Sequence, residues 1–165
     1  MRRTGATSTA VPDAAPVRAP DVASLYHQQS DRLRRVAYLM TGRREAAEEI
    51  VHDAFVRLHG RWAGLDEPAA YLRTTVVNLC LDWQRRGATE RRAPEPVERL
   101  VAPPEIDETW DRLATLPQPQ RVALVLRYYD DLSIEQIAGL VGCAPATVRT
   151  RIHRAITRLR QELTP

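Results

Sequence analysis

The chain has 165 residues, 44% of them hydrophobic and 27% charged, with a formal net charge of +3. This length leaves room for one domain or two small ones with modest cores. The two cysteines, Cys80 and Cys143, lie in no CxxC or Cys/His pattern, which excludes a disulfide framework and a structural zinc site. No apolar run approaches the length of a membrane span, so we expect a soluble, cytoplasmic protein.

Charge is unevenly distributed, and all 24 basic residues are arginine. Residues 121–165 hold seven arginines and four acids, whereas residues 87–120 hold four arginines and seven acids. The use of arginine alone fits coding bias and a preference for bidentate contacts, and by itself it does not prove nucleic-acid binding.

Residues 1–20 are rich in Ala, Pro, Thr and Ser without a hydrophobic period, so we expect a disordered leader. Order is expected from Asp21, because apolar residues then recur at helical spacing as far as Met40. Thr41 and Gly42 end this first helix, since glycine readily adopts the left-handed conformation of a helix C-terminus.

The next predicted helix, residues 45–59, is amphipathic. Its inner face carries Ala47, Ile50, Val51, Ala54, Phe55 and Leu58. Its outer face carries Glu49, His52, Asp53 and Val56. An apolar side chain within a charged face favours docking onto a partner, although single exposed apolar residues are common on ordinary surfaces. The pattern supports both interpretations equally.

Pro68 opens a third predicted helix that runs to about Arg86. Its inner stripe is Leu72, Val76, Leu79 and Trp83, and its opposite face gathers Tyr71, Thr74, Asn78, Leu81 and Arg85. An aromatic ring, an amide and a guanidinium together could stack on unpaired bases, hydrogen-bond to them and hold phosphate. A solvated helix with scattered polar residues is the alternative.

Residues 87–104 contain four prolines and no apolar period, which indicates a linker. After it we expect a short helix and then a second helix at about residues 119–129. Their apolar residues are Ile106, Trp110, Leu113, Leu116, Val122, Val125, Leu126 and Tyr129. The sequence therefore predicts an all-α chain of two small helical domains, residues 21–86 and 105–165, joined by a flexible linker.

Residues 132–160 predict two amphipathic helices joined by a glycine-containing turn, the pattern of a helix-turn-helix. Ser133 and Gln136 have the spacing of a capping box, and Pro145 suits the first position of the second helix. Between Pro145 and Arg160 there are five arginines and no acid. Arginine pairs with phosphates and with guanine, so this helix favours DNA recognition over its alternative, a basic solvated helix.

Three stretches, which cover nearly all of residues 21–163, carry a family resemblance: AYLMTGRREAAEEIVHDAFVRLHGRW, YLRTTVVNLCLDWQRRG and LPQPQRVALVLRYYDDLSIEQIAGLVGCAPATVRTRIHRAITRLR. The chain resembles a bacterial RNA polymerase sigma-70 family factor of the extracytoplasmic function (ECF, group 4) type, and looks most like its SigE-like actinobacterial subfamily. The resemblance implies a protein that gives promoter specificity to RNA polymerase core and that has no catalytic residues and no cofactor of its own.

The resemblance also implies roles for particular residues and partners. The helix at residues 45–59 is implied to dock on the clamp helices of the polymerase largest-subunit pair through Glu49, His52, Asp53 and Val56. The flap region of the polymerase core is a further implied partner of the chain. The helix at residues 68–86 is implied to capture the melted non-template strand of the minus-10 element through Tyr71, Arg73, Asn78 and Arg85. The helix-turn-helix is implied to read the minus-35 duplex through Thr147, Arg149, Thr150, Arg151, His153 and Arg154. An anti-sigma factor is a further partner that the resemblance allows.

Two positions depart from the family pattern, since His52 stands where Gln is usual and Ala144 where Ser commonly caps the recognition helix. Two other classes of protein explain less of the sequence. A stand-alone helix-turn-helix regulator would leave residues 21–86 without a role. A helical metalloenzyme with a carboxylate-bridged metal pair needs two Glu-x-x-His pairs, and Glu49 with His52 provides one.

Overall fold

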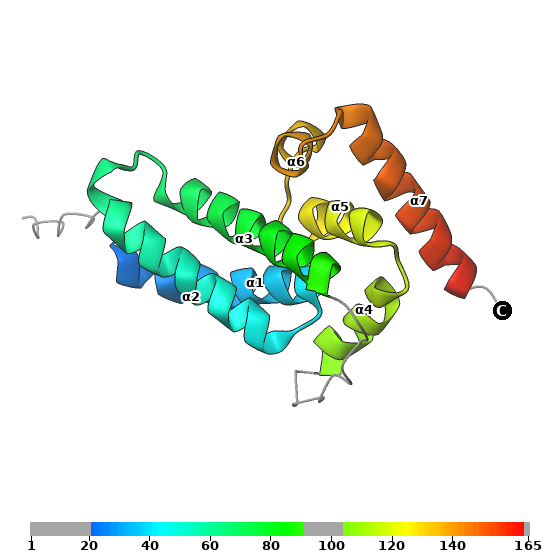
Figure 1. Ribbon diagram of the computed structural model, residues 1–165, viewed down its shortest axis with the longest axis horizontal. Coiled ribbons are helices and arrows are strands. Elements are labelled where there is room, and N and C mark those ends of the chain that lie inside the picture. Colours follow the sequence, from blue (N-terminus) through cyan, green and yellow to red (C-terminus); the bar gives the residue numbers. More distant parts are fainter. Residues whose placement is uncertain (1–20, 91–103, 164–165) are drawn as a thin grey trace, which may run out of the picture.

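A computed structural model describes residues 21–90 and 104–163, which form α-helices joined by short turns (Figure 1). The predicted all-α class is confirmed, because these two ranges contain no β-strand. The predicted leader and most of the predicted linker lie outside the described residues.

The first group of helices comprises α1 (Val22–Thr41), α2 (Arg44–Arg61), the 3-10 turn η1 (Trp62–Gly64) and α3 (Pro68–Glu90). Asp21 caps α1 by accepting a hydrogen bond from the Ser24 N–H at 2.7 Å. Gly42 ends α1 in the left-handed conformation, with φ at 73°, and donates its N–H to the Tyr38 carbonyl. The predicted end of the first helix is thereby confirmed.

The core of this group is built from the stripes that helical spacing predicts. It contains Val36, Met40, Val51, Ala54, Leu58, Leu72 and Val76, which are all at most 1% exposed. Trp83, also expected inside, is only half-buried. α3 continues to Glu90, past its predicted end at Arg86, because the single Gly87 costs a helix only about 1 kcal/mol and does not stop it.

The second group comprises α4 (Pro104–Ala114), α5 (Gln118–Tyr128), α6 (Ile134–Val141) and α7 (Pro145–Leu163). The capping box of α6 is confirmed: the Gln136 N–H donates to Ser133 Oγ at 3.1 Å, and the Ser133 N–H donates to Gln136 Oε1 at 2.8 Å. Gly142 forms the turn with φ at 67°. Leu126, Ile137, Val148 and Ala155 fill the centre beneath the helix-turn-helix.

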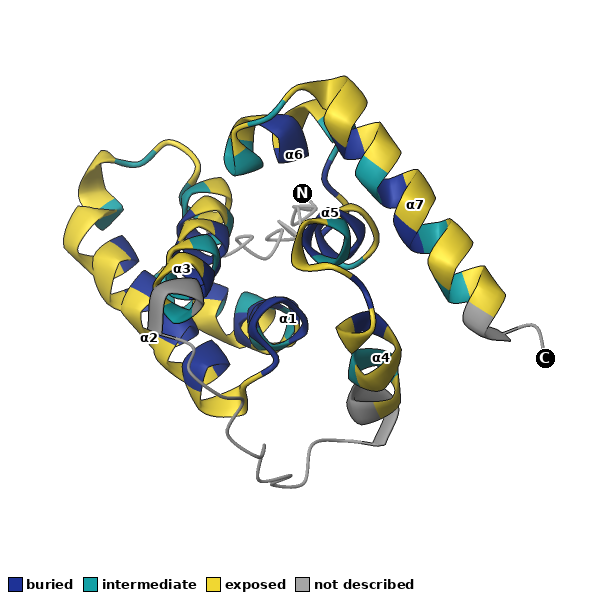
Figure 2. Cartoon of the chain, turned by 45° about the vertical axis from the view of Figure 1, so that its right-hand side comes forward, coloured by how far each residue is buried: buried dark blue, intermediate teal, exposed yellow. Residues whose placement is uncertain are grey.

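The two groups pack against each other, which the sequence did not predict (Figure 2). α5 lies against α1, and α6 lies against α3. The Trp110 ring covers the backbone at Gly42, where any Cβ atom would collide with it, and packs on Tyr38 with ring centroids 5.7 Å apart. The buried residues of both groups therefore form one continuous cluster.

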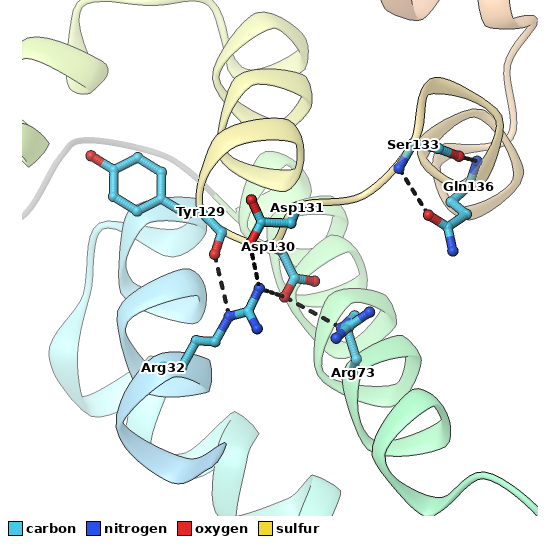
Figure 3. Close-up of polar contacts among 7 residues, drawn as sticks. All are labelled: Arg32, Arg73, Tyr129, Asp130, Asp131, Ser133 and Gln136. Carbon is cyan, nitrogen blue, oxygen red and sulfur yellow. Dashed lines mark hydrogen bonds and ion pairs between the residues drawn. The ribbon is translucent and has the colours of Figure 1, made fainter. Parts of the chain in front are cut away.

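A carboxylate lies inside this contact. Asp130, which follows α5, is 1% exposed and lies between Arg32 of α1 and Arg73 of α3 (Figure 3). Burial raises the pKa of Asp130 above its ordinary value of 3.8; Arg73 and Arg32 oppose the rise, and the neighbouring Asp131 adds to it.

Two apolar residues of α2 provide a matched test of the core. Leu58→Ala removes a side chain with no exposed surface, so we expect the free energy of unfolding to fall by about 2–5 kcal/mol. Val56→Ala alters a side chain that is 58% exposed and should change it by no more than about 0.5 kcal/mol. Urea unfolding measures both, and equal losses would contradict the described orientation of α2.

The raised pKa of Asp130 predicts a pH-dependent contribution to stability. Below pH 3.8 the carboxyl is neutral in both the folded and the unfolded chain, whereas above its raised pKa the folded chain alone holds a poorly solvated charge. Stability contributed by Asp130 is therefore lost as pH rises through the raised pKa. We expect Asp130→Asn to unfold at a higher urea concentration than wild type at pH 7, with a difference that shrinks in acid. A less stable variant at pH 7 would mean that Arg32 and Arg73 outweigh desolvation.

Candidate nucleic-acid and partner interfaces

The outer face of α2 carries the four residues assigned to partner binding. Glu49, His52, Asp53 and Val56 are all exposed, and their spacing of three, one and three residues places them on one side of the helix. The other side of α2 faces the core, so the rotation of the helix is fixed. These four residues form a single surface stripe. It contains two carboxylates and an imidazole and ends at the apolar side chain of Val56.

Three of the four residues assigned to the minus-10 strand share a side of α3. At about 100° per residue, Tyr71, Asn78 and Arg85 fall on one stripe. Tyr71 is half-buried, whereas Asn78 and Arg85 are exposed. The Arg85 guanidinium forms an ion pair with Asp82 of its own helix at 3.1 Å. This stripe combines an aromatic ring, an amide and a cation, as stacking on single-stranded bases requires.

Arg73 does not join this stripe, because it lies well round the helix from the other three. Its Nε atom is 3.4 Å from Asp130 Oδ1, on the side of α3 that faces the second group. An open groove of about 280 Å³ lies beside it, lined by Ala70 and Thr74 of α3 and by Gln136 and Leu140 on α6. The structure therefore separates Arg73 from the other three residues assigned to the minus-10 strand.

The helix-turn-helix buries one face of α7 and exposes the other. Val148, Ile152 and Ala155 face the core. The exposed residues from the predicted minus-35 set are Thr147, Arg149, Thr150, His153 and Arg154. Ala144 provides no side-chain cap, and its carbonyl accepts the Thr147 N–H at 2.9 Å instead. The first N–H groups of a helix have no carbonyl partner within that helix and attract anions. At the start of α7 fewer of them are available, because Pro145 has no N–H and the Thr147 N–H is already bonded to Ala144.

Two of the predicted minus-35 arginines already have partners within the chain. Arg149 forms an ion pair of 3.2 Å with Glu135 of α6, and both side chains are mostly exposed. Arg151 is half-buried and points its Nη1 atom at the Cys143 sulfur, 3.6 Å away. Arg154 thus stands among Thr147 and Thr150 on the outward side of α7, where a helix lying in a DNA groove makes its contacts.

The cluster of Arg32, Arg73, Asp130 and Asp131 was missed by the sequence reasoning. Arg32 Nη2 lies 3.5 Å from Asp130 Oδ1 and 3.2 Å from Asp131 Oδ2, and its Nε donates to the Tyr129 carbonyl at 3.4 Å. Periodicity carries no signal for a contact between residues so far apart in sequence. The only local hint is a pair of acids directly after a helix end.

The described ranges were also compared with the features of a metal site and of a membrane-spanning helix. These ranges contain no group of three or more His, Cys, Asp or Glu residues that could hold a metal ion. None of their helices has both the length and the apolar character that spanning a bilayer requires. Cys80 and Cys143 are free thiols, and burial raises the pKa of Cys80 to about 12, so it stays protonated.

Comparison with known families and proteins gives matches to both halves. Residues 25–90 match the family model for sigma-70 region 2, and residues 106–159 match the model for sigma-70 region 4. The RNA polymerase sigma-E factor of Streptomyces coelicolor is 32% identical over 80% of this chain and 82% of its own length. The ECF RNA polymerase sigma factor SigE of Mycolicibacterium smegmatis is 33% identical over 95% of this chain and 68% of its own length.

A solved structure has the same fold. The sigma factor RpoE of Bartonella quintana, crystallised with the anti-sigma factor NepR, superimposes with a TM-score of 0.67 at 22% identity, over 88% of this chain and 98% of that one. Together with the matches to regions 2 and 4, the sequence relatives establish the family: this chain belongs to the sigma-70 family, as an RNA polymerase sigma factor of the extracytoplasmic function type with SigE-like relatives.

Proposed function

We propose that this chain binds RNA polymerase core through α2, reads a minus-35 duplex with α7 and captures the melted minus-10 non-template strand with α3. It would act in the cytoplasm as a specificity factor, with no catalytic site and no cofactor of its own. An anti-sigma factor is a further proposed partner, because the related factor from Bartonella quintana was crystallised with one.

The observation that carries the proposal is that three different exposed surfaces of the chain have three different chemistries. The α2 stripe mixes acids with exposed Val56, the α3 stripe mixes an aromatic ring with polar groups, and the outer side of α7 is cationic. A protein that only binds duplex DNA needs the third surface alone. Three such surfaces suit a factor that has to engage a protein, unpaired bases and a duplex together.

The free energies of base stacking and phosphate contact support separate roles for α3 on unpaired bases and α7 on duplex DNA. Extracting a base from the stack costs a few kcal/mol, and stacking on an aromatic side chain returns about 1–3 kcal/mol per base. Phosphate contacts add affinity without sequence preference. Two modest interactions on one chain then reinforce each other once both are engaged, because the second becomes intramolecular.

The decisive experiment mixes the purified chain with sigma-free RNA polymerase core and runs off transcripts from a pool of genomic promoter fragments. We expect the chain to co-elute with core and new start sites to depend on its addition. Binding to duplex DNA without any binding to core would replace this proposal with the stand-alone regulator.

Asp53 provides a test of the polymerase contact. Asp53→Ala removes a carboxylate from the α2 stripe and leaves a charged partner at the interface unpaired. We expect affinity for core to fall about tenfold, which corresponds to about 1.4 kcal/mol. Glu48→Ala is the matched control, because Glu48 is an exposed carboxylate of the same helix whose ion-pair partner is Arg44. Equal losses in both variants, measured by anisotropy of labelled protein, would count against a specific contact.

Asn78 and Arg154 should separate strand capture from duplex binding. Arg154→Ala should weaken binding of the holoenzyme to duplex promoter DNA by about 1–3 kcal/mol and reduce its salt dependence. Asn78→Ala should leave duplex binding intact and lower permanganate reactivity of minus-10 thymines, because it removes the amide that we propose to contact unpaired bases. Loss of duplex binding in both variants would contradict this separation.

A further inference from the structure

Two arginines from different helices converge on one carboxylate at the contact between the helix groups. Arg32 and Arg73 approach the same oxygen, Asp130 Oδ1, at 3.5 and 3.4 Å (Figure 3). Asp131 adds a second, exposed carboxylate to Arg32 at 3.2 Å. The arginine side chains keep 37% and 32% of their surface exposed, whereas Asp130 keeps 1%. The cations thus reach solvent, and the anion does not.

Asp130 fits these cations poorly. Charge-assisted N–H···O contacts are typically about 2.7–2.9 Å, and both ion pairs to Asp130 are longer. Among the residues that the structure describes, none donates a hydrogen bond to either carboxylate oxygen of Asp130. Burial raises its pKa, because desolvation outweighs the two arginines. A carboxylate held this way is a weak ligand that a better anion can displace.

We propose that Arg32 and Arg73 form a binding site for a backbone phosphate of nucleic acid, and that Asp130 occupies this site while the two helix groups are packed together. A phosphate offers more acceptor oxygens than the single one that both guanidiniums share here, and planar guanidinium groups suit it. This inference rests on the proposed function, since Arg73 lies on the helix assigned to the minus-10 strand.

The packed arrangement and phosphate binding exclude each other at this site. The second helix group covers the same side of α3, with α6 residues lining the groove beside Arg73. The Trp110 ring on Gly42 and Tyr38 forms a separate apolar part of the same contact. Loosening either part should therefore expose the arginine pair and strengthen binding to a strand of any sequence.

The test measures binding of a fluorescein-labelled 20-nucleotide oligodeoxythymidine to the full chain by anisotropy, without polymerase. Asp130→Lys places a cation between two arginines and should force the groups apart, so we expect about tenfold tighter binding. Asp111→Lys is the control, because it makes the same charge change at an exposed residue of α4. Equal gains in both variants would overturn the proposal.

Adding Arg32→Gln to the Asp130→Lys chain tests the site itself. We expect the added substitution to abolish the gain and to make the negative slope of log affinity against log salt less steep by about 0.7, the value for one phosphate contact on a single strand. Arg73→Gln should act in the same way. A gain that survives both substitutions would assign the oligonucleotide to another surface.

A second variant leaves Asp130 and the net charge unchanged, in case Asp130→Lys fails to fold. Trp110→Ala removes the ring from Gly42 and should also tighten oligonucleotide binding, and Arg32→Gln should cancel that gain. A helical variant, verified by circular dichroism, that binds as wild type does would overturn the proposed occlusion.

Because this assay contains no polymerase, its outcome is independent of the run-off experiment. The phosphate site can hold in a chain that does not bind core, and core-dependent transcription can occur in a chain whose arginine pair binds no oligonucleotide.

Discussion

Removing the Asp130 carboxylate from water is the constraint that shapes the contact between the two helix groups. A buried charge is tolerated only with partners, and even well-paired buried ions often contribute no net stability. Here the partners lie at 3.4 and 3.5 Å, and burial still raises the pKa of the carboxyl. The ion pairs therefore offset the desolvation only in part. The association of the two groups depends instead on apolar contacts such as Trp110 against Tyr38.

The same logic of burial fixes the exposed surfaces. Because Val51, Ala54 and Leu58 of α2 are buried, the helix can have only one orientation about its own axis. In that orientation Asp53 and Val56 face solvent. In α7 the buried Val148, Ile152 and Ala155 do the same for the basic side of the helix. Core packing therefore determines which side chains are exposed to partners. The exposed side chains are not needed for the core, so their chemistry can suit binding.

The local features of the fold could be read from the sequence because their partners are close along the chain. The capping box joins Ser133 and Gln136, three residues apart, and Gly42 and Gly142 end helices through their own backbone conformation. The buried stripes can be predicted from the spacing of apolar residues, because that spacing places them on one face of a single helix. Such features do not depend on how the helices are arranged.

The contact between the groups could not be read in this way. Arg32 and Asp131 are 99 residues apart, and nothing near either residue indicates the other. Arg73 was grouped with Tyr71 by family resemblance, although helical rotation separates them, and its neighbour in space comes from beyond the predicted linker. The extension of α3 to Glu90 was missed for a simpler reason, since a glycine weakens a helix without necessarily ending it.

Acids of this chain lie beside four of the arginines assigned to proposed nucleic-acid surfaces: Asp130 beside Arg32 and Arg73, Asp82 beside Arg85, and Glu135 beside Arg149. An exposed ion pair such as that of Arg149 contributes at most about 1 kcal/mol. A well-placed base contact is worth about 1–3 kcal/mol, so it can displace the acid, whereas a poorly placed phosphate gains little by doing so. The acids that pair with these arginines therefore weaken binding to nucleic acid of any sequence more than they weaken binding to a matching sequence. Under the proposed function few promoters have to be found among many other sequences, and that difference then matters more than affinity itself.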